Sequence, residues 1–194
     1  PARRAEGDRV LESSRELWVG VVGIGARCYL AALADSSPVP ARLVAAADTA
    51  PDAVERAERL LPEGVAVVAD HRDLLGHGID AVVLTTPDET NEEWAGCSLE
   101  AGIRVYLGKP RSITTEAAEN ILETARHTGT RLYVSHNMRH MEVVRLLKSI
   151  IDSGRIGELK AIWCRHFVGN GGDYYFRDWH AERRHVTGLL LQKA

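Results

Sequence analysis

The stretch that decides the fold is residues 18–28, WVGVVGIGARC. Trp18–Val22 is a short apolar run with the length of a buried strand, and Gly23 follows it directly. We predict a tight turn at Gly23 and a helix over Ala26–Ala34, ended by the polar residues before Pro38. A strand, a glycine turn and a helix in this order are typical of the opening βα unit of a doubly wound sheet.

The alternation of apolar runs and helical patterns continues along the chain. Five more runs are predicted as strands: 42–47, 65–68, 80–85, 103–107 and 131–135. Four helices are predicted between them: 51–61, 70–75, 89–101 and 114–128. Strands that are apolar throughout are buried on both faces, which is typical of a parallel sheet with helices on each side. The sequence therefore predicts the α/β class, with an N-terminal doubly wound, parallel Rossmann sheet over residues 18–136.

The pattern changes after this sheet. Residues 141–153 are predicted as an amphipathic helix, and residues 158–168 alternate between polar and apolar side chains like a long strand. We assign residues 137–194 to the beginning of a second, incomplete α/β domain, and the charged residues 1–17 to a tail. The last residues, 188–194, have the composition of a helix that begins and does not end. We expect a longer protein; the alternative is a truncated chain that binds a nucleotide without turnover.

Composition excludes several classes of partner. The 194 residues include 24 basic and 27 acidic side chains, for a net charge of −3, which favours neither nucleic acid nor an anionic membrane. No apolar run approaches the ~20 residues that span a bilayer. The three cysteines are far apart, and we expect buried, reduced thiols in a cytoplasmic protein. The pair His136 and His140 makes a zinc site conceivable, but no Cys or carboxylate completes a ligand set, and we predict no metal.

The glycine turn has the context of a dinucleotide site. Gly25 has no side chain to keep a pyrophosphate from the helix N-terminus, where Ala26 and Arg27 follow. Cys28 replaces the third glycine of the usual pattern. Asp48, at the end of the second strand, can accept hydrogen bonds from both ribose hydroxyls and should repel a 2′-phosphate. The sequence therefore predicts NAD as cofactor, with NADP as the alternative because Arg27 offsets part of that repulsion; an ordinary turn is the other interpretation.

Two more loops are expected beside the cofactor. Thr86 and Pro87 follow the fourth strand, and Lys109 and Pro110 follow the fifth, so all four lie at the carboxyl edge of a doubly wound sheet. A lysine there can hold a substrate oxygen and stabilise or share its proton during hydride transfer. The alternative is a surface lysine in a loop.

Taken together, these features resemble the family of glucose–fructose oxidoreductase, inositol 2-dehydrogenase and rhizopine catabolism proteins. The segments that carry the resemblance are VGVVGIGAR (19–27), VAAAD (44–48), DAVVLTTPDETN (80–91), AGIRVYLGKP (101–110), RLYVSHNMRH (131–140) and GRIGELKAIW (154–163). The resemblance implies a Rossmann domain followed by an α/β domain whose open, mainly antiparallel sheet often mediates oligomers. It also implies NAD- or NADP-dependent oxidation or reduction of sugars, cyclitols or related polyols.

The family signature after the fifth strand is Glu-Lys-Pro. Lys109 and Pro110 match it, and Gly108 replaces the glutamate. The resemblance therefore implies that Lys109 is catalytic and contacts both substrate and nicotinamide. The loop after the fourth strand departs as well, since Asn91 stands where the family often has a histidine. Both departures alter the hydrogen-bond network around the lysine.

Substrate contacts are implied beyond the sheet. Asn137 and Arg139 lie where the family loop after the sixth strand reaches the substrate cleft; a structural pair at a domain junction is the alternative. Residues 187–192 resemble the front of the family's catalytic helix, and Gln192 takes the position of its aspartate. The histidine of that motif, the implied general acid and base, would follow Ala194.

Our hypothesis is an NAD(P)-dependent oxidoreductase that transfers a hydride between nicotinamide and a carbon of a sugar, amino sugar or cyclitol. The alternatives are redox-neutral cleavage of glycosides with transient use of NAD, and a nucleotide-binding module without turnover. We expect a small sugar or polyol as partner, neither nucleic acid nor membrane, and a homo-oligomer where the C-terminal sheet is complete.

Overall fold

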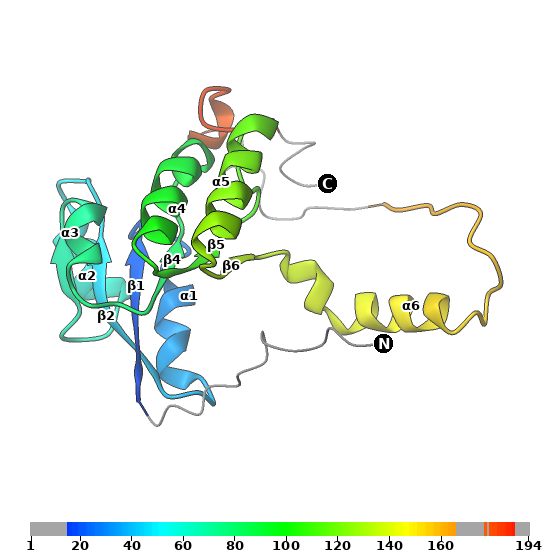
Figure 1. Cartoon of the computed structure of the whole chain (residues 1–194), viewed down its shortest axis with the longest axis horizontal. Coiled ribbons are helices and arrows are strands. Elements are labelled where there is room, and N and C mark those ends of the chain that lie inside the picture. The colour runs from blue at the N-terminus through cyan, green and yellow to red at the C-terminus, as the bar shows by residue number, and fades with distance from the viewer. Residues whose placement is uncertain (1–14, 166–176, 178, 189–194) are drawn as a thin grey trace.

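The computed structural model describes residues 15–165, 177 and 179–188 of the chain. Its centre is a six-stranded sheet with the strand order β3-β2-β1-β4-β5-β6 (Figure 1). All five neighbouring pairs of strands are parallel. The chain builds outward from β1 to β3, crosses back, and builds outward again from β4, which is the doubly wound arrangement. The predicted Rossmann sheet is therefore confirmed.

The strands begin and end close to their predicted bounds. They are β1 Leu17–Val22, β2 Ala41–Ala47, β3 Ala66–Val68, β4 Ala81–Leu84, β5 Arg104–Leu107 and β6 Leu132–Val134. Each end lies within one residue of the prediction, because an apolar run between polar loops marks a strand that is buried on both faces.

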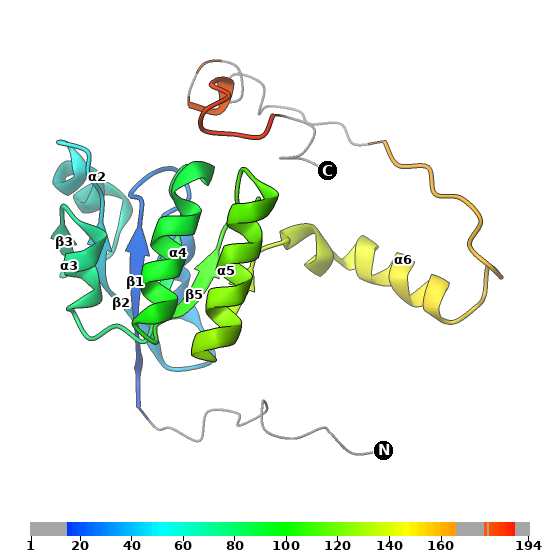
Figure 2. The ribbon, with the colours of Figure 1, turned by 45° about the horizontal axis from the view of Figure 1, so that its top comes forward.

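Helices cover both faces of the sheet. They are α1 Tyr29–Ala32, α2 Ala53–Leu60, α3 His71–Leu75, α4 Asn91–Glu100, α5 Thr115–Thr128 and α6 Glu142–Asp152, with the 3-10 turns η1 Leu33–Ser36, η2 Asp88–Thr90, η3 Asn137–His140 and η4 Trp179–Ala181. One core includes α1 and α2, with Ile24 and Val21 fully buried. The other includes α3, α4 and α5, with Leu99 fully buried and Ile121 almost so (Figure 2). The two apolar layers hold the sheet between them.

Side-chain caps fix the starts of two helices. The Asp70 carboxylate accepts a hydrogen bond from the backbone N–H of Arg72 at 2.8 Å, before α3. Thr114 Oγ1 accepts one from the N–H of Ala117 at 3.1 Å, before α5. Gly129 ends α5 with φ of 67°, in the left-handed region that glycine tolerates. These local signals explain why the bounds of α5 match the prediction.

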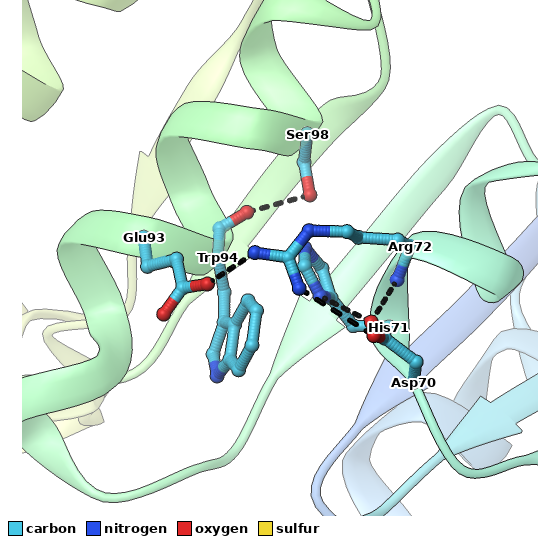
Figure 3. A network of polar contacts seen from close by, with 6 residues as sticks. All are labelled: Asp70, His71, Arg72, Glu93, Trp94 and Ser98. Atoms are coloured by element: carbon cyan, nitrogen blue, oxygen red, sulfur yellow. Dashed lines mark hydrogen bonds and ion pairs between the residues drawn. The ribbon is translucent and has the colours of Figure 1, made fainter.

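A polar and aromatic cluster joins α3 to α4 (Figure 3). The imidazole of His71, with only 1% of its side chain exposed, lies with its ring centre 3.7 Å from that of Trp94. Arg72 lies over the same indole and donates to the Glu93 carboxylate at 2.6 Å. Burial lowers the pKa of His71, partly offset by the Asp70 carboxylate 3.3 Å from its Nδ1. The neutral imidazole therefore serves as a packing group between the two helices.

The first helix is shorter than predicted. Ala26–Ala34 was expected to be helical, but α1 begins at Tyr29 and continues as the 3-10 turn η1. The N–H of Cys28 donates to the carbonyl of Gly25 at 3.1 Å, so residues 25–28 form a turn that leads into the helix. The prediction was wrong here because glycine turns have no periodic pattern that separates them from a first helical turn.

The strand predicted over residues 158–168 is wrong for residues 158–165, which form neither helix nor strand. Residues 166–168 lie outside the described residues. Alternating side chains favour a strand only where another strand supplies hydrogen bonds, and no described residue pairs with this segment. The preceding helix α6 was predicted within one residue at each end, and it projects away from the sheet with no buried residue (Figure 1).

No helix in the described ranges is long and apolar enough to cross a bilayer.

Candidate functional site

The predicted cofactor residues meet at the carboxyl edge of the sheet. Parallel strands all end at the same edge, so the loops after β1, β2, β4 and β5 lie together. The strands β1 and β4 are neighbours there, which marks the crevice where ligands bind in doubly wound sheets. Thr85 ties these two strand ends together, because its Oγ1 donates to the carbonyl oxygen of Gly23 at 2.8 Å. Its N–H donates to the carbonyl of Val22 at 2.9 Å.

The turn after β1 requires a glycine at its first position. Gly23 has φ of +94°, and a Cβ there would lie 3.0 Å from the backbone carbon and oxygen of Thr85. At Gly25, by contrast, a Cβ would meet nothing within 4 Å, so the outer side of the turn is open. Among the described residues, the N–H groups of Gly25, Ala26 and Arg27 donate no hydrogen bond. Three unused donors beside an open turn fit the pyrophosphate of a dinucleotide.

Cys28 occupies the position of the third glycine and is buried, with 1% of its surface exposed. It belongs to the same apolar core as Val21 and Ala31. Burial raises the pKa of its thiol, which keeps the group protonated near neutral pH. Cys28 therefore acts as a small packing residue between α1 and the sheet, as expected for this position.

Asp48 lies directly against the glycine turn. Its Oδ2 accepts a hydrogen bond from the N–H of Ile24 at 2.7 Å, and its Oδ1 accepts one from the N–H of Ala50 at 2.9 Å. The carboxylate thus holds the ends of β1 and β2 in register while 15% of its side chain stays exposed. A carboxylate has about four acceptor positions. Capacity remains for a ribose hydroxyl, so the residues present fit the adenosine end of the cofactor as well.

A second residue, which was not predicted from the sequence, contacts Asp48: Arg56 on α2. Its Nη2 lies 3.0 Å from Asp48 Oδ2, and its Nε lies 3.3 Å from Asp52 Oδ1. Arg27, which was expected to offset the charge of Asp48, is an exposed residue of the turn. The eight-residue separation of Arg56 from Asp48 follows no known motif, and only the packing of α2 on the sheet brings the two together.

The loop after β4 is held by its own side chains. The hydroxyl of Thr90 lies 2.8 Å from that of Thr86 and donates to the carbonyl of Pro87 at 2.9 Å. The methyl group of Thr86 faces the glycine turn, since it would lie 3.1 Å from a Cβ at Gly23. Thr86 therefore lies against the glycine turn, and Pro87 follows it in the same loop.

The loop that carries Lys109 is joined to α4 by Asn91. The Nδ2 of Asn91, a residue only 3% exposed, donates to the carbonyl of Pro110 at 3.1 Å. The N–H of Gly108 donates to the carbonyl of Leu84 at 3.3 Å, so the loop leaves β5 beside the end of β4. The Lys109–Pro110 peptide bond is cis. Asn91, which stands where the family often has a histidine, thus still supplies a hydrogen bond to the loop of Lys109.

A segment far along the chain also reaches this edge. His185 Nδ1 contacts a carboxylate oxygen of Glu89 in η2, and its Nε2 lies 3.7 Å from Glu182. The neighbouring Val186 is buried, with 4% exposed. Figure 2 shows the segment, in red, at the N-terminal ends of α4 and α5, which is the side where the strands end. The pairing of His185 with Glu89 could not be predicted from the sequence, because 96 residues separate the two.

The predicted substrate residues are spread more widely. Asn137 and Arg139 both lie in η3, the 3-10 turn that follows β6. Arg139 lines a surface hollow that it shares with α6 residues, among them Arg145 and Lys148. Gln192 lies outside the described residues. The structure therefore gathers the cofactor residues at one edge and leaves Asn137 and Arg139 on the extension toward α6.

The expectation of three buried, reduced cysteines is only partly confirmed. All three cysteines are free, but only Cys28 is buried; Cys97 is half-buried and Cys164 is exposed. Cys164 belongs to the segment without strand partners, which explains its exposure. His140 Nε2 lies 2.6 Å from the hydroxyl of Tyr133. In the part of the chain that the structure describes, no three His, Cys, Asp or Glu side chains form a group that could hold a metal ion.

Several known proteins are similar to this chain. The family model described as "Oxidoreductase family, NAD-binding Rossmann fold" matches residues 17–136. Inositol 2-dehydrogenase of Azotobacter vinelandii is 31% identical over 169 residues, which cover 82% of this chain and 48% of that protein. The chain therefore spans about half the length of the curated relatives that it matches.

Solved structures give the same result. The WlbA dehydrogenase of Bordetella pertussis, in complex with NADH and UDP-GlcNAcA, matches with a TM-score of 0.68 and 29% identity over 75% of this chain and 42% of that one. The scyllo-inositol dehydrogenase of Lactobacillus casei, with bound NAD(H) and scyllo-inositol, matches with a TM-score of 0.65 and 26% identity over 74% of this chain and 43% of that one. With its glycine turn, Asp48 and the Lys109-Pro110 loop at one edge of a matching Rossmann sheet, the chain belongs to the family of NAD-binding oxidoreductases that includes glucose–fructose oxidoreductase, inositol 2-dehydrogenase and the rhizopine catabolism proteins.

Proposed function

We propose that this chain is the cofactor-binding part of an oxidoreductase that transfers a hydride between nicotinamide and a carbon of a sugar, amino sugar or cyclitol. The observation that carries the proposal is the arrangement of the carboxyl edge. The open glycine turn and Asp48 lie after β1 and β2, and the Lys109 loop lies after β5, anchored to α4 by Asn91. Relatives that act on inositols, or that bind NADH with a sugar nucleotide, support this substrate class.

Each residue at the edge has a separate task in this proposal. The N–H groups after Gly23 bind the pyrophosphate, and Asp48 accepts a ribose hydroxyl. Thr86 and Pro87 border the nicotinamide end. When bound, the cofactor supplies or accepts the hydride. The ammonium group of Lys109 holds the substrate oxygen at the reacting carbon and stabilises or shares its proton.

The proposal extends to the second half of the protein. We place the domain boundary after residue 136 and assign residues 137–194 to the start of a substrate and oligomerisation domain with an open, mainly antiparallel sheet. Asn137, Arg139 and Gln192 are its proposed substrate contacts. The contact between His185 and Glu89 supports this division, because it brings the later segment onto the cofactor edge. Three unpaired cysteines support a cytoplasmic location.

The test uses the whole protein with NAD and a panel of cyclitols, sugars and sugar nucleotides, read by absorbance of NADH. For the active substrate, Lys109→Ala should lower kcat/KM by about 10²–10⁴-fold, the usual contribution of a positioned acid–base group. NADH binding, followed by fluorescence, should change little. Lys160→Ala is the matched control, because Lys160 is exposed and paired only with Glu158 in the segment after α6.

Three results distinguish this proposal from its rivals. Unchanged turnover in Lys109→Ala would refute the role of the lysine. Sugar release without net formation of NADH would indicate redox-neutral glycoside cleavage. Tight NADH binding with no turnover across the panel would favour a binding module.

A further inference from the structure

The charge of Asp48 is partly offset within the protein itself. The acid that ends β2 normally repels a ribose 2′-phosphate and so selects NAD. Here the guanidinium of Arg56 lies 3.0 Å from Asp48 Oδ2, the oxygen that also accepts the N–H of Ile24. A 2′-phosphate that approaches Asp48 therefore meets a cation beside the carboxylate, and this cation offsets part of the repulsion even though Arg56 also pairs with Asp52.

Arg56 is positioned but not locked. Its Nε lies 3.3 Å from Asp52, one helical turn earlier on α2, which holds the side chain toward the glycine turn. Yet Nε and Nη2 have no hydrogen-bond partner of good geometry among the described residues, so both ion pairs are contacts of charge alone. These two nitrogens are buried, while the side chain as a whole is 24% exposed. The guanidinium can thus donate some of its N–H groups to a phosphate while it remains beside Asp48.

We infer that Arg56 is the specificity-determining residue for the cofactor, and that it allows the site to accept NADP as well as NAD. The inference rests on the proposed dinucleotide site. With NAD, Asp48 accepts the ribose hydroxyl and Arg56 compensates the buried charge. With NADP, the guanidinium takes a phosphate oxygen, for which its planar set of donors is well shaped.

The structure distinguishes Arg56 from the two other arginines nearby. Arg27 is exposed on the turn and has no ion pair among the described residues. Arg59 lies on the same helix, with 63% of its side chain exposed, and faces Glu55 at 3.9 Å. It is therefore a matched control for a lost positive charge on α2.

The experiment measures dissociation constants of NADH and NADPH by fluorescence for the protein and its variants, without any substrate. We expect the wild-type ratio of Kd for NADPH to Kd for NADH to lie within about tenfold. In Arg56→Gln this ratio should rise about tenfold, the size of one lost charge-assisted hydrogen bond. Arg56→Lys should keep most of the wild-type ratio, and Asp48→Asn should shift it toward NADPH. Arg59→Gln and Arg27→Gln should change it by less than about threefold.

Thermal unfolding of each variant shows whether it is folded, and Arg56→Met, which keeps the aliphatic part of the side chain and removes its charge, serves as the test if Arg56→Gln is not. A folded Arg56→Gln with an unchanged ratio overturns the inference, as does an equal change in Arg59→Gln or a larger change in Arg27→Gln. If the wild type binds neither nucleotide, the proposed function itself is wrong, and this inference with it.

Discussion

The Rossmann sheet and the extension after it, which includes α6, both contain helices with apolar side chains, but these side chains are packed very differently. In the sheet region, the helical residue Leu99 is fully buried, and two apolar cores enclose the strands. In α6 the apolar side chains of Val143, Leu146 and Leu147 are between 54% and 60% exposed. Both the helix of Leu99, α4, and the helix α6 were predicted from the sequence, so a helical pattern indicates where a helix forms but not what covers its apolar side chains.

The largest difference should appear when the same substitution is made in both regions. Leu99→Ala should lower the free energy of unfolding by about 3 kcal/mol, because it removes buried methyl groups and leaves a cavity. Leu146→Ala, in α6, should change it by less than about 0.5 kcal/mol. Chemical denaturation of both variants measures the contrast. If Leu146→Ala lowered the free energy of unfolding by several kcal/mol, the apolar face of α6 would be covered in solution, and the two regions would not differ in packing.

A smaller effect is expected at the turn on which the cofactor site depends. Gly23→Ala should lower the free energy of unfolding by about 2 kcal/mol, since it forces a Cβ against Thr85 at a positive φ. NADH binding should weaken as well. The control is Gly96→Ala inside α4, where a Cβ meets nothing within 4 Å and alanine should raise stability by about 0.5–1 kcal/mol. Equal effects at the two glycines would contradict the strained turn.

The helix cap of α5 should contribute less. Thr114→Ala removes the hydrogen bond to the N–H of Ala117 and should lower stability by about 1 kcal/mol. Thr124→Ala on the same helix is the control, because that hydroxyl bonds only to the carbonyl of Asn120 within the helix. If Thr124→Ala lowered the free energy of unfolding as much as Thr114→Ala, a specific capping role for Thr114 would be contradicted.

The smallest effect near neutral pH concerns His71, whose pKa burial lowers from its ordinary value of 6.5. Below that pH the unfolded chain takes up a proton that the folded chain binds more weakly. Stability should therefore be full above pH 6.5 and decline as the pH falls from there toward the lower folded pKa.

His71→Phe should flatten part of this decline in unfolding curves measured between pH 7 and about 5. The exposed His77→Gln is the control. A decline that remains the same in His71→Phe would place its origin elsewhere.

Much of the sheet could be predicted because its signals are local. Apolar runs marked all six strands, and Asp70, Thr114 and Gly129 marked helix ends through contacts with near neighbours. The glycine turn and the loop of Lys109 could be placed at one edge from the parallel topology alone. The strand predicted over residues 158–165 was wrong because its signal is not local: a strand depends on hydrogen bonds from another segment.

The candidate site shows the same division. Gly23, Asp48 and Lys109 were identified because each follows a strand at a recognisable distance. Asn91 was placed at the position of the family's histidine, but its hydrogen bond to the carbonyl of Pro110 was not predicted. Arg56 was missed as a site residue, although it contacts Asp48 directly, because its spacing to Asp48 follows no motif.

By itself, the sequence determined the order of strands and helices, the turn that only glycine can make, and the edge at which a dinucleotide would bind. These follow from periodicity and backbone sterics, which act over a few residues. Tertiary structure alone decided that Arg56 faces Asp48, that Asn91 holds the Lys109 loop, and that His185 meets Glu89 across 96 residues. Such contacts depend on how whole helices and segments pack on the sheet, and packing is set by the shape and burial of many side chains at once.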